Sequence, residues 1–381
     1  MRYPALLTAA ILAFLLCVPQ VMAGKREDSE LVSKISARAA VVIDVNTDRI
    51  LFEKKAQQRM RIASLTKIMT AIVAIENADL KETVTVSPRA VGVEGSSIYL
   101  KEGEKIPLEH LLYGLMLRSG NDAATAIAEH VGGSLPGFVY LMNEKAHYLG
   151  LDDTHFKNPH GLDAPNHYST AEDMARLTAY ALRNPAFKKI VSTPVKTVPW
   201  PGEEWHRKWY NKNKMLRLYP GADGVKTGYT KLSKRTLVSS ATREGRQLAT
   251  VTLNASNDWN DSMHLLEYGF VHYRPVELIQ KGEEMSDVPV SKKLSLSVTA
   301  EKSFTYPLTE EERKEVTVKP ILTYPLSKID KEGMRVGMAR VYLKGEVVGS
   351  VPLVTRTNSA SVSSVFTDWM TVITYVLGKE G

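Results

Sequence analysis

The sequence predicts an α+β domain followed by a smaller all-β domain. Strand patterns lie at both ends of the region 24–275, and apolar residues at helical spacing fill the stretch between them. Strands from distant chain segments are expected to form one sheet on which these helices pack. Beyond residue 276 the pattern changes to alternating apolar and polar residues, which predicts an all-β domain over 276–358.

Each element follows from a local pattern. A hairpin is predicted at 40–53, with turn residues Asn46 and Thr47 between its strands. Apolar residues at helical spacing from Leu65 to Val73 predict the first helix. Further helices are predicted at 108–131, 137–149, 169–182 and 259–272, strands at 224–229, 235–242 and 247–253, and long loops over 193–224. In the second domain, strands are predicted at 294–298, 316–318, 339–343 and 347–353.

The first 23 residues have the pattern of an export signal. Arg2 precedes an apolar run from Ala5 to Val18, and Val21-Met22-Ala23 resembles a signal-peptidase site. We expect cleavage after Ala23 and an exported protein at the outer face of the cytoplasmic membrane or in the cell wall; a retained anchor is the alternative. The only cysteine, Cys17, lies in this segment, so the mature chain has no thiol for a disulfide, a nucleophile or a metal.

The C-terminal segment 359–381 contains an amphipathic pattern. Apolar residues form one broad stripe between Val362 and Leu377, and Ser, Thr and Asp occupy the other face. Such a helix suits the membrane interface, with Trp369 and Tyr375 near the headgroups. We expect peripheral membrane contact; packing against the protein's own β domain is the alternative.

Three short motifs carry the chemistry. They are Ser64-Leu65-Thr66-Lys67, Ser119-Gly120-Asn121 and Lys226-Thr227-Gly228; the first and the last types each occur once. A serine needs a nearby base to become a nucleophile. Ser64 and Lys67, three residues apart on a helix, are neighbours on one face. Burial and a second cation, Lys226, would lower the pKa of Lys67 enough for its neutral form to be that base.

The remaining motif residues fit the rest of an acyl transfer. Ser119 is placed to relay a proton to the leaving amine, and Asn121 to hold the substrate backbone. The backbone N–H groups of Ser64 and Tyr229 are candidate oxyanion donors. Lys226 and Thr227 are candidates for binding a substrate carboxylate, and Gly228 would let the substrate lie against the strand as an added β-ladder.

The three motifs in this order are the signature of penicillin-binding proteins and class A β-lactamases. The chain resembles the low-molecular-mass D-alanyl-D-alanine carboxypeptidases in particular. The resemblance covers nearly the whole length, and it includes the segments 61–70, 114–123, 158–163 and 223–230. It implies a penicillin-binding, β-lactamase-like domain with an antiparallel sheet and helices, and a Ser64 acyl-enzyme formed on peptidoglycan stem pentapeptides. β-Lactams are implied inhibitors, and no cofactor or metal is implied.

Two segments refine this resemblance. Residues 231–238 and Asn257-Asp258-Trp259 are similar to the sporulation-associated branch, which implies a role in modifying spore-cortex peptidoglycan. Some relatives carry an arginine near the start of the helix after the last sheet strand, where it assists carboxylate recognition. The corresponding stretch here, 257–261, holds no basic residue, so the sequence does not locate the further cation that would join Lys226 and Thr227.

Other functions are less well supported by the residues. A β-lactamase is expected to carry a dedicated acid in a Glu-x-x-Leu-Asn motif, which is absent between Asn121 and Lys226. A non-catalytic β-lactam sensor or wall-binding module would not need the full set of motif residues. The net charge of +7 comes with no nucleic-acid-binding signature, so no nucleic-acid partner is expected. His155, His160 and His167 match no common metal-binding spacing.

Overall fold

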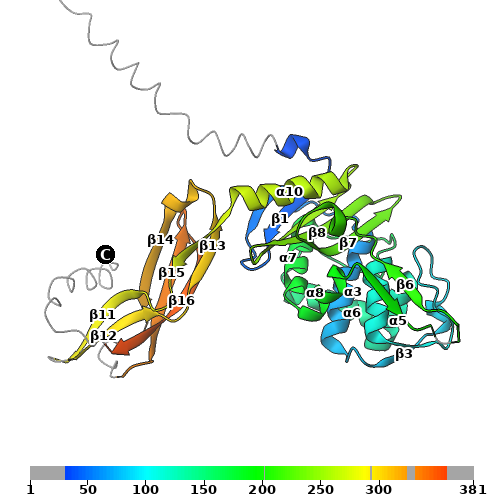
Figure 1. The fold of residues 1–381 in the computed structure, drawn as a ribbon, viewed down its shortest axis with the longest axis horizontal. Helices are drawn as coiled ribbons and strands as arrows, with labels where there is room; N and C mark the ends of the chain where they lie inside the picture. The colour runs from blue at the N-terminus through cyan, green and yellow to red at the C-terminus, as the bar shows by residue number, and fades with distance from the viewer. Residues whose placement is uncertain (1–30, 201, 292–293, 324–330, 358–381) are drawn as a thin grey trace, which may run out of the picture. The chain divides into compact units, whose positions relative to one another are not determined.

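The computed structural model describes residues 31–200, 202–291, 294–323 and 331–357 (Figure 1). Within it the chain divides into two compact units, with the boundary between Phe270 and Val271. The predicted signal peptide, 1–23, and the predicted amphipathic tail, 359–381, both lie outside the described residues.

The first unit is built on a five-stranded antiparallel sheet. Its strand order is β2-β1-β9-β8-β7, so the N-terminal hairpin pairs through β1 with a strand more than 200 residues later in the chain. The strands are β1 (Ala39–Asp44), β2 (Ile50–Lys54), β7 (Ala222–Thr230), β8 (Lys234–Arg243) and β9 (Arg246–Leu253). The predicted hairpin and the three predicted later strands are therefore confirmed. The β7 strand, which carries Lys226-Thr227-Gly228, is an edge strand with one side free for a ligand.

Helices cover both faces of this sheet (Figure 1). The α7 helix packs on β1 and β9, and α8 packs on β7. On α10, Gly269 lies so close to the sheet that a Cβ there would come 2.7 Å from Leu248 and 3.1 Å from Val42. The helices are α3 (Lys67–Asn77), α4 (Leu108–Tyr113), α5 (Asn121–Gly132), α6 (Leu135–Tyr148), α7 (Ala171–Leu182), α8 (Pro185–Ser192), α9 (Met215–Leu218) and α10 (Asp258–His272).

The helix predicted over 108–131 is interrupted at the second motif. After α4 a π-helical stretch, Gly114–Arg118, ends at Ser119, whose φ of 65° is left-handed, and α5 begins at Asn121. The π turn and the reversed backbone at Ser119 break the helical ladder and turn the Ser119 side chain out of the helix row. The interruption presents Ser119 and Asn121 at the start of α5, next to the first motif.

The prediction of long loops over 193–224 is wrong. This stretch contains a small hairpin, β5 (Val195–Val198) paired with β6 (Arg207–Tyr210), and the short helix α9. The hairpin is held by the ion pair between Arg207 and Glu104, both nearly buried, and by Arg207 over the Trp200 ring. The ion pair joins distant segments, so no local periodicity signals it. A second small hairpin pairs β3 (Thr83–Thr85) with β4 (Lys105–Pro107).

The second unit is all-β, as predicted. Its main sheet has the order β11-β12-β16-β15-β14, and a two-stranded sheet pairs β10 with β13. The strands are β10 (Arg274–Ile279), β11 (Glu284–Ser291), β12 (Leu294–Ala300), β13 (Phe304–Leu308), β14 (Val316–Leu322), β15 (Arg335–Leu343) and β16 (Glu346–Thr357). On β15 the alternate residues Ala339, Val341 and Leu343 are buried in the apolar core of this unit. Over the part of the chain that the structure describes, none of the helices combines the length and apolarity needed to cross a membrane.

Candidate active site

Ser64 lies in a 3₁₀ turn, Ala63–Thr66, that leads directly into α3. The α-helix therefore begins at Lys67, and the 3₁₀ geometry stacks residues three apart. Ala63 has a left-handed φ of 49°. Two hydrogen bonds hold the turn: Thr66 Oγ1 donates to the Ala63 carbonyl at 2.9 Å, and Thr236 Oγ1 on β8 donates to the Ile62 carbonyl at 3.2 Å.

His167 supports this turn from behind. Its Nδ1 accepts the backbone N–H of Lys157 at 3.2 Å, which leaves Nε2 to donate to Thr66 Oγ1 at 2.9 Å. Burial lowers the pKa of His167 to about 4, so the ring is neutral at neutral pH, as this hydrogen-bond pattern requires. His167 is thus a buried histidine, with both ring nitrogens hydrogen-bonded, that supports the turn carrying Ser64.

Lys67 is fully buried, and its amine contacts three oxygen atoms. Nζ lies 3.0 Å from Ser64 Oγ, 2.7 Å from Asn121 Oδ1 and 2.6 Å from the His160 carbonyl oxygen. Asn121 Oδ1 and the carbonyl can only accept, so they take two amine hydrogens. A neutral amine has only two, and its lone pair is then left for the hydroxyl of Ser64.

The surroundings of Lys67 favour this neutral form. Burial is the main cause that holds the pKa of Lys67 well below its ordinary value, and the positive charges of Lys226 and Lys212 lower it further. Burial likewise lowers the pKa of Lys226 to about 7, with Lys212 contributing in the same direction. Positive charge gathered around Lys67 therefore disfavours its protonation.

Asn121, of the second motif, contacts Lys67 directly. It is 5% exposed and does not line the cavity described below. Its Oδ1 accepts from Lys67, and its Nδ2 donates to the Glu94 carbonyl at 2.5 Å. Both halves of the amide are thus engaged, and Asn121 positions Lys67.

The third motif, on β7, runs beside Ser64. Lys226 is 1% exposed, and its Nζ donates to the Thr227 carbonyl at 2.7 Å. A Cβ at Gly228 would lie 2.4 Å from Thr236 Oγ1 and 3.1 Å from Ser64 N, so only glycine allows the strand this close to the serine. Thr227, Gly228 and the exposed Tyr229 face the cavity, whereas Lys226 does not.

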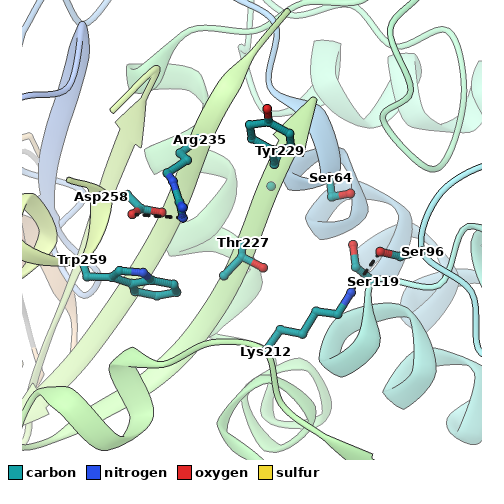
Figure 2. Close-up of a pocket in the computed structure, with 10 residues that line it drawn as sticks. Ser64, Ser96, Ser119, Lys212, Thr227, Tyr229, Arg235, Asp258 and Trp259 are labelled. Carbon is teal, nitrogen blue, oxygen red and sulfur yellow. Dashed lines mark hydrogen bonds and ion pairs between the residues drawn. The ribbon is translucent and has the colours of Figure 1, made fainter. Parts of the chain in front are cut away.

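A cavity of about 430 Å³ opens above Ser64 (Figure 2). The sequence motifs supply Ser64, Ser119, Thr227, Gly228 and Tyr229 to its lining. Its other lining residues were not predicted: Ser96, Lys212, Arg235, Asp258 and Trp259. Two cations and one carboxylate are among the ten, so the lining carries a net positive charge that suits an anionic ligand.

The two unpredicted cations lie on different sides of the cavity (Figure 2). Lys212 follows β6, and its Nζ donates to Ser96 Oγ at 3.0 Å. Burial lowers the pKa of Lys212, and Arg118 adds to this. Arg235, near the start of β8, lies 3.9 Å from Asp258 in the first turn of α10. The register of the β7–β8 hairpin is the signal that could have located Arg235, since Tyr229 pairs with it.

The described residues include no group of three or more His, Cys, Asp or Glu side chains that could hold a metal ion. His155, His160 and His167 each make a different contact. His160 supplies a backbone carbonyl to Lys67, and His155 Nδ1 contacts the Asn166 carbonyl oxygen at 2.7 Å. The site that the motifs form is a serine–lysine centre.

Comparison with known proteins identifies the family of this chain. Residues 25–257 match the family model described as D-alanyl-D-alanine carboxypeptidase, and residues 273–360 match that of the C-terminal domain of penicillin-binding protein 5. The chain belongs to the D-alanyl-D-alanine carboxypeptidase family. This confirms the family, the fold class and the activity predicted from the sequence: the chain is a serine-type D-alanyl-D-alanine carboxypeptidase.

Individual relatives agree with this assignment. The carboxypeptidase is 33% identical to D-alanyl-D-alanine carboxypeptidase DacF of Bacillus subtilis over 299 residues, which span 75% of this chain and 76% of DacF. It is 32% identical to DacA of Escherichia coli K12 over 325 residues, 77% of either chain. The structure of penicillin-binding protein 5 from Haemophilus influenzae superposes with a TM-score of 0.70 at 29% identity, covering 85% of this chain and 97% of the other.

Proposed function

We propose that Ser64 is the nucleophile of this carboxypeptidase and that neutral Lys67 is its general base. The observation that carries the proposal is the buried Lys67 amine, 3.0 Å from Ser64 Oγ with two acceptor-only partners. Lys67 takes the hydroxyl proton as Ser64 Oγ attacks the carbonyl of the penultimate D-alanine of a stem pentapeptide. A tetrahedral intermediate with a negative oxygen forms.

The remaining groups complete the reaction. The backbone N–H groups of Ser64 and Tyr229 are proposed to bind the oxyanion. Ser119, at the cavity wall, relays the proton held by Lys67 to the leaving nitrogen, and the C–N bond breaks to release D-alanine and leave Lys67 neutral. Lys67 then accepts a proton from the water that attacks the Ser64 ester, and it passes this proton to Ser64 Oγ as the ester bond breaks and the shortened peptide is released. Buried Lys226 contributes charge beside Lys67, and Thr227 binds the substrate carboxylate.

Release of D-alanine tests this assignment. The chain from residue 24 should release D-alanine from a pentapeptide that ends in D-Ala-D-Ala, and Ser64→Ala should release none. Thr85→Ala, on β3 away from the site, is the matched control and should keep wild-type activity. Unchanged release by Ser64→Ala would show that another group is the nucleophile.

We further propose that residues 1–23 direct export and that residues 359–381 contact the membrane. The family acts on peptidoglycan peptides and is inhibited by β-lactams, which fits a protein outside the cytoplasm. Residues 24–275 are then the catalytic domain, and 276–358 the β domain that separates it from the tail. Deleting 359–381 should move the protein from the membrane fraction to the soluble one, and unchanged fractionation would contradict the tail's role.

Action on spore-cortex peptidoglycan is the finer part of the proposal. It is supported by the segments 231–238 and 257–259 and by the similarity to DacF. Loss of the gene should leave more intact pentapeptide side chains in cortex muropeptides than in the wild type. A cortex composition that does not change, with altered vegetative wall, would place the enzyme in growth instead.

A further inference from the structure

The cation for the substrate's terminal carboxylate is missing from the three motifs. Lys226, the residue expected for it, is 1% exposed, does not line the cavity and is hydrogen-bonded to the Thr227 carbonyl. Among the described residues, the cationic side chains that line the cavity are Lys212 and Arg235. These two side chains are therefore the candidates for pairing with a carboxylate bound at Thr227.

The β7–β8 register places Arg235 on the Thr227 side. Thr227 pairs with Leu237 and Tyr229 pairs with Arg235, so all four side chains share one face of the sheet. Arg235 is then the diagonal neighbour of Thr227 on the adjacent strand, within reach of a long side chain. In Figure 2 its guanidinium extends between Asp258 and Thr227. Lys212, by contrast, donates to Ser96 on the other wall.

Asp258 lies beside this guanidinium. Its side chain is 6% exposed at the start of α10, and it lies 3.9 Å from Arg235, whose side chain is 57% exposed. A single loose contact leaves most of the five N–H donors of the guanidinium free to form a two-pronged pair with a carboxylate. Asp258 lies in the stretch 257–261, which holds no arginine of its own.

We propose that Arg235, oriented by Asp258, binds the terminal carboxylate of the acyl donor together with the Thr227 hydroxyl and so selects peptides that end in a free carboxylate. The proposal rests on the proposed function and deepens it: Arg235 is the specificity-determining residue, and Asp258 is a positioning residue that acts through it. In this chain an arginine on a strand provides the positive charge, and a carboxylate on a helix orients it.

A pair of peptides tests the proposal. One is a stem-peptide analogue that ends in D-Ala-D-Ala, and the other is the same peptide with its terminal carboxylate converted to a primary amide. For Arg235→Gln we expect kcat/KM on the carboxylate peptide to fall on the order of 10- to 100-fold, as for the loss of a charge-assisted hydrogen bond. We expect less than about threefold change on the amide, because the amide offers no charge to pair.

Further variants separate the alternatives. Asp258→Asn should lower kcat/KM on the carboxylate peptide less than Arg235→Gln does, mainly by raising KM. Combined with Arg235→Gln, it should cause no further loss. Lys212→Met removes the other cation that lines the cavity and is the matched control variant. The proposal would be overturned if kcat/KM on the carboxylate peptide fell selectively in Lys212→Met but not in Arg235→Gln. It would also be overturned if Arg235→Gln lowered kcat/KM equally on both peptides. A wild type that turns over neither peptide would instead overturn the proposed function, and with it this inference.

Discussion

Replacing Asn121 by aspartate tests the neutral-base role of Lys67 in depth. Asn121 Oδ1 lies 2.7 Å from Lys67 Nζ, and both side chains are buried. The substitution adds a negative charge with almost no change in volume. With an effective dielectric constant of about 20, unit charges at the observed 2.7 Å attract by about 6 kcal/mol, so the carboxylate stabilises the protonated amine.

Only part of that energy is needed for a large effect on rate. About a quarter of it, roughly 1.5 kcal/mol, raises the pKa of Lys67 by about one unit, and once that pKa lies above the assay pH each further unit lowers the neutral fraction of Lys67 about tenfold. We expect Asn121→Asp to slow acylation by benzylpenicillin at least about tenfold at pH 7, and to move the acidic limb of the rate profile to higher pH. Stopped-flow acylation rates at a series of pH values provide the measurement.

Asn121→Ala is the matched control for this experiment. Like Asn121→Asp, it loses the hydrogen bond to the Glu94 carbonyl, but it adds no charge. It should therefore slow acylation while moving the acidic limb of the pH–rate profile less than Asn121→Asp does. A wild-type rate and an unmoved acidic limb in Asn121→Asp would contradict the role of Lys67 as a neutral base, because an amine beside that carboxylate cannot keep its low pKa.

Burial, charge and backbone geometry lead to three further predictions. Lys67→Met removes a buried amine whose pKa is lowered in the folded protein. The unfolded wild-type chain therefore binds more protons at this amine than the folded chain does, so the free energy of unfolding of the wild type should rise relative to that of the variant between pH 7 and 10. Thermal melts across this range provide the measurement. Lys212→Met removes a positive charge that lowers the pKa of Lys67, so its acylation profile should shift to higher pH; an unshifted profile contradicts the coupling. Gly161→Ala places a Cβ 1.9 Å from the Ala63 carbonyl oxygen at a φ of 87°, so it should both destabilise the fold and slow acylation. Gly133→Ala is the control: its φ is 67° and no atom lies within 4 Å of the added Cβ, so it should lower the free energy of unfolding in urea by only about 1 kcal/mol.

Much of this site could be predicted because its chemistry is local in sequence. The spacing of Ser64 and Lys67 fixes their contact within one turn, and the turn before Asn121 presents Ser119 at a helix junction. The strand patterns also predicted β7 and β8 correctly. These patterns depend on neighbours within a few residues, which is the range over which periodicity carries information.

The unpredicted residues depend on contacts between distant segments. Lys212 reaches Ser96 from more than a hundred residues away, and Asp258 meets Arg235 only once α10 packs on the sheet. Asn121 was assigned to the substrate because its motif indicates an active-site residue. The Lys67 and Glu94 contacts that occupy its amide become visible only in three dimensions.

Intact mass after mixing the protein from residue 24 with benzylpenicillin is the decisive measurement for the roles of Ser64 and Lys67. We expect a long-lived adduct of one penicillin per chain, absent from Ser64→Ala and formed much more slowly by Lys67→Met. No adduct with intact penicillin would show that Ser64 and Lys67 do not form a working nucleophile. No adduct with consumed penicillin would show rapid deacylation, and the enzyme would then act as a β-lactamase.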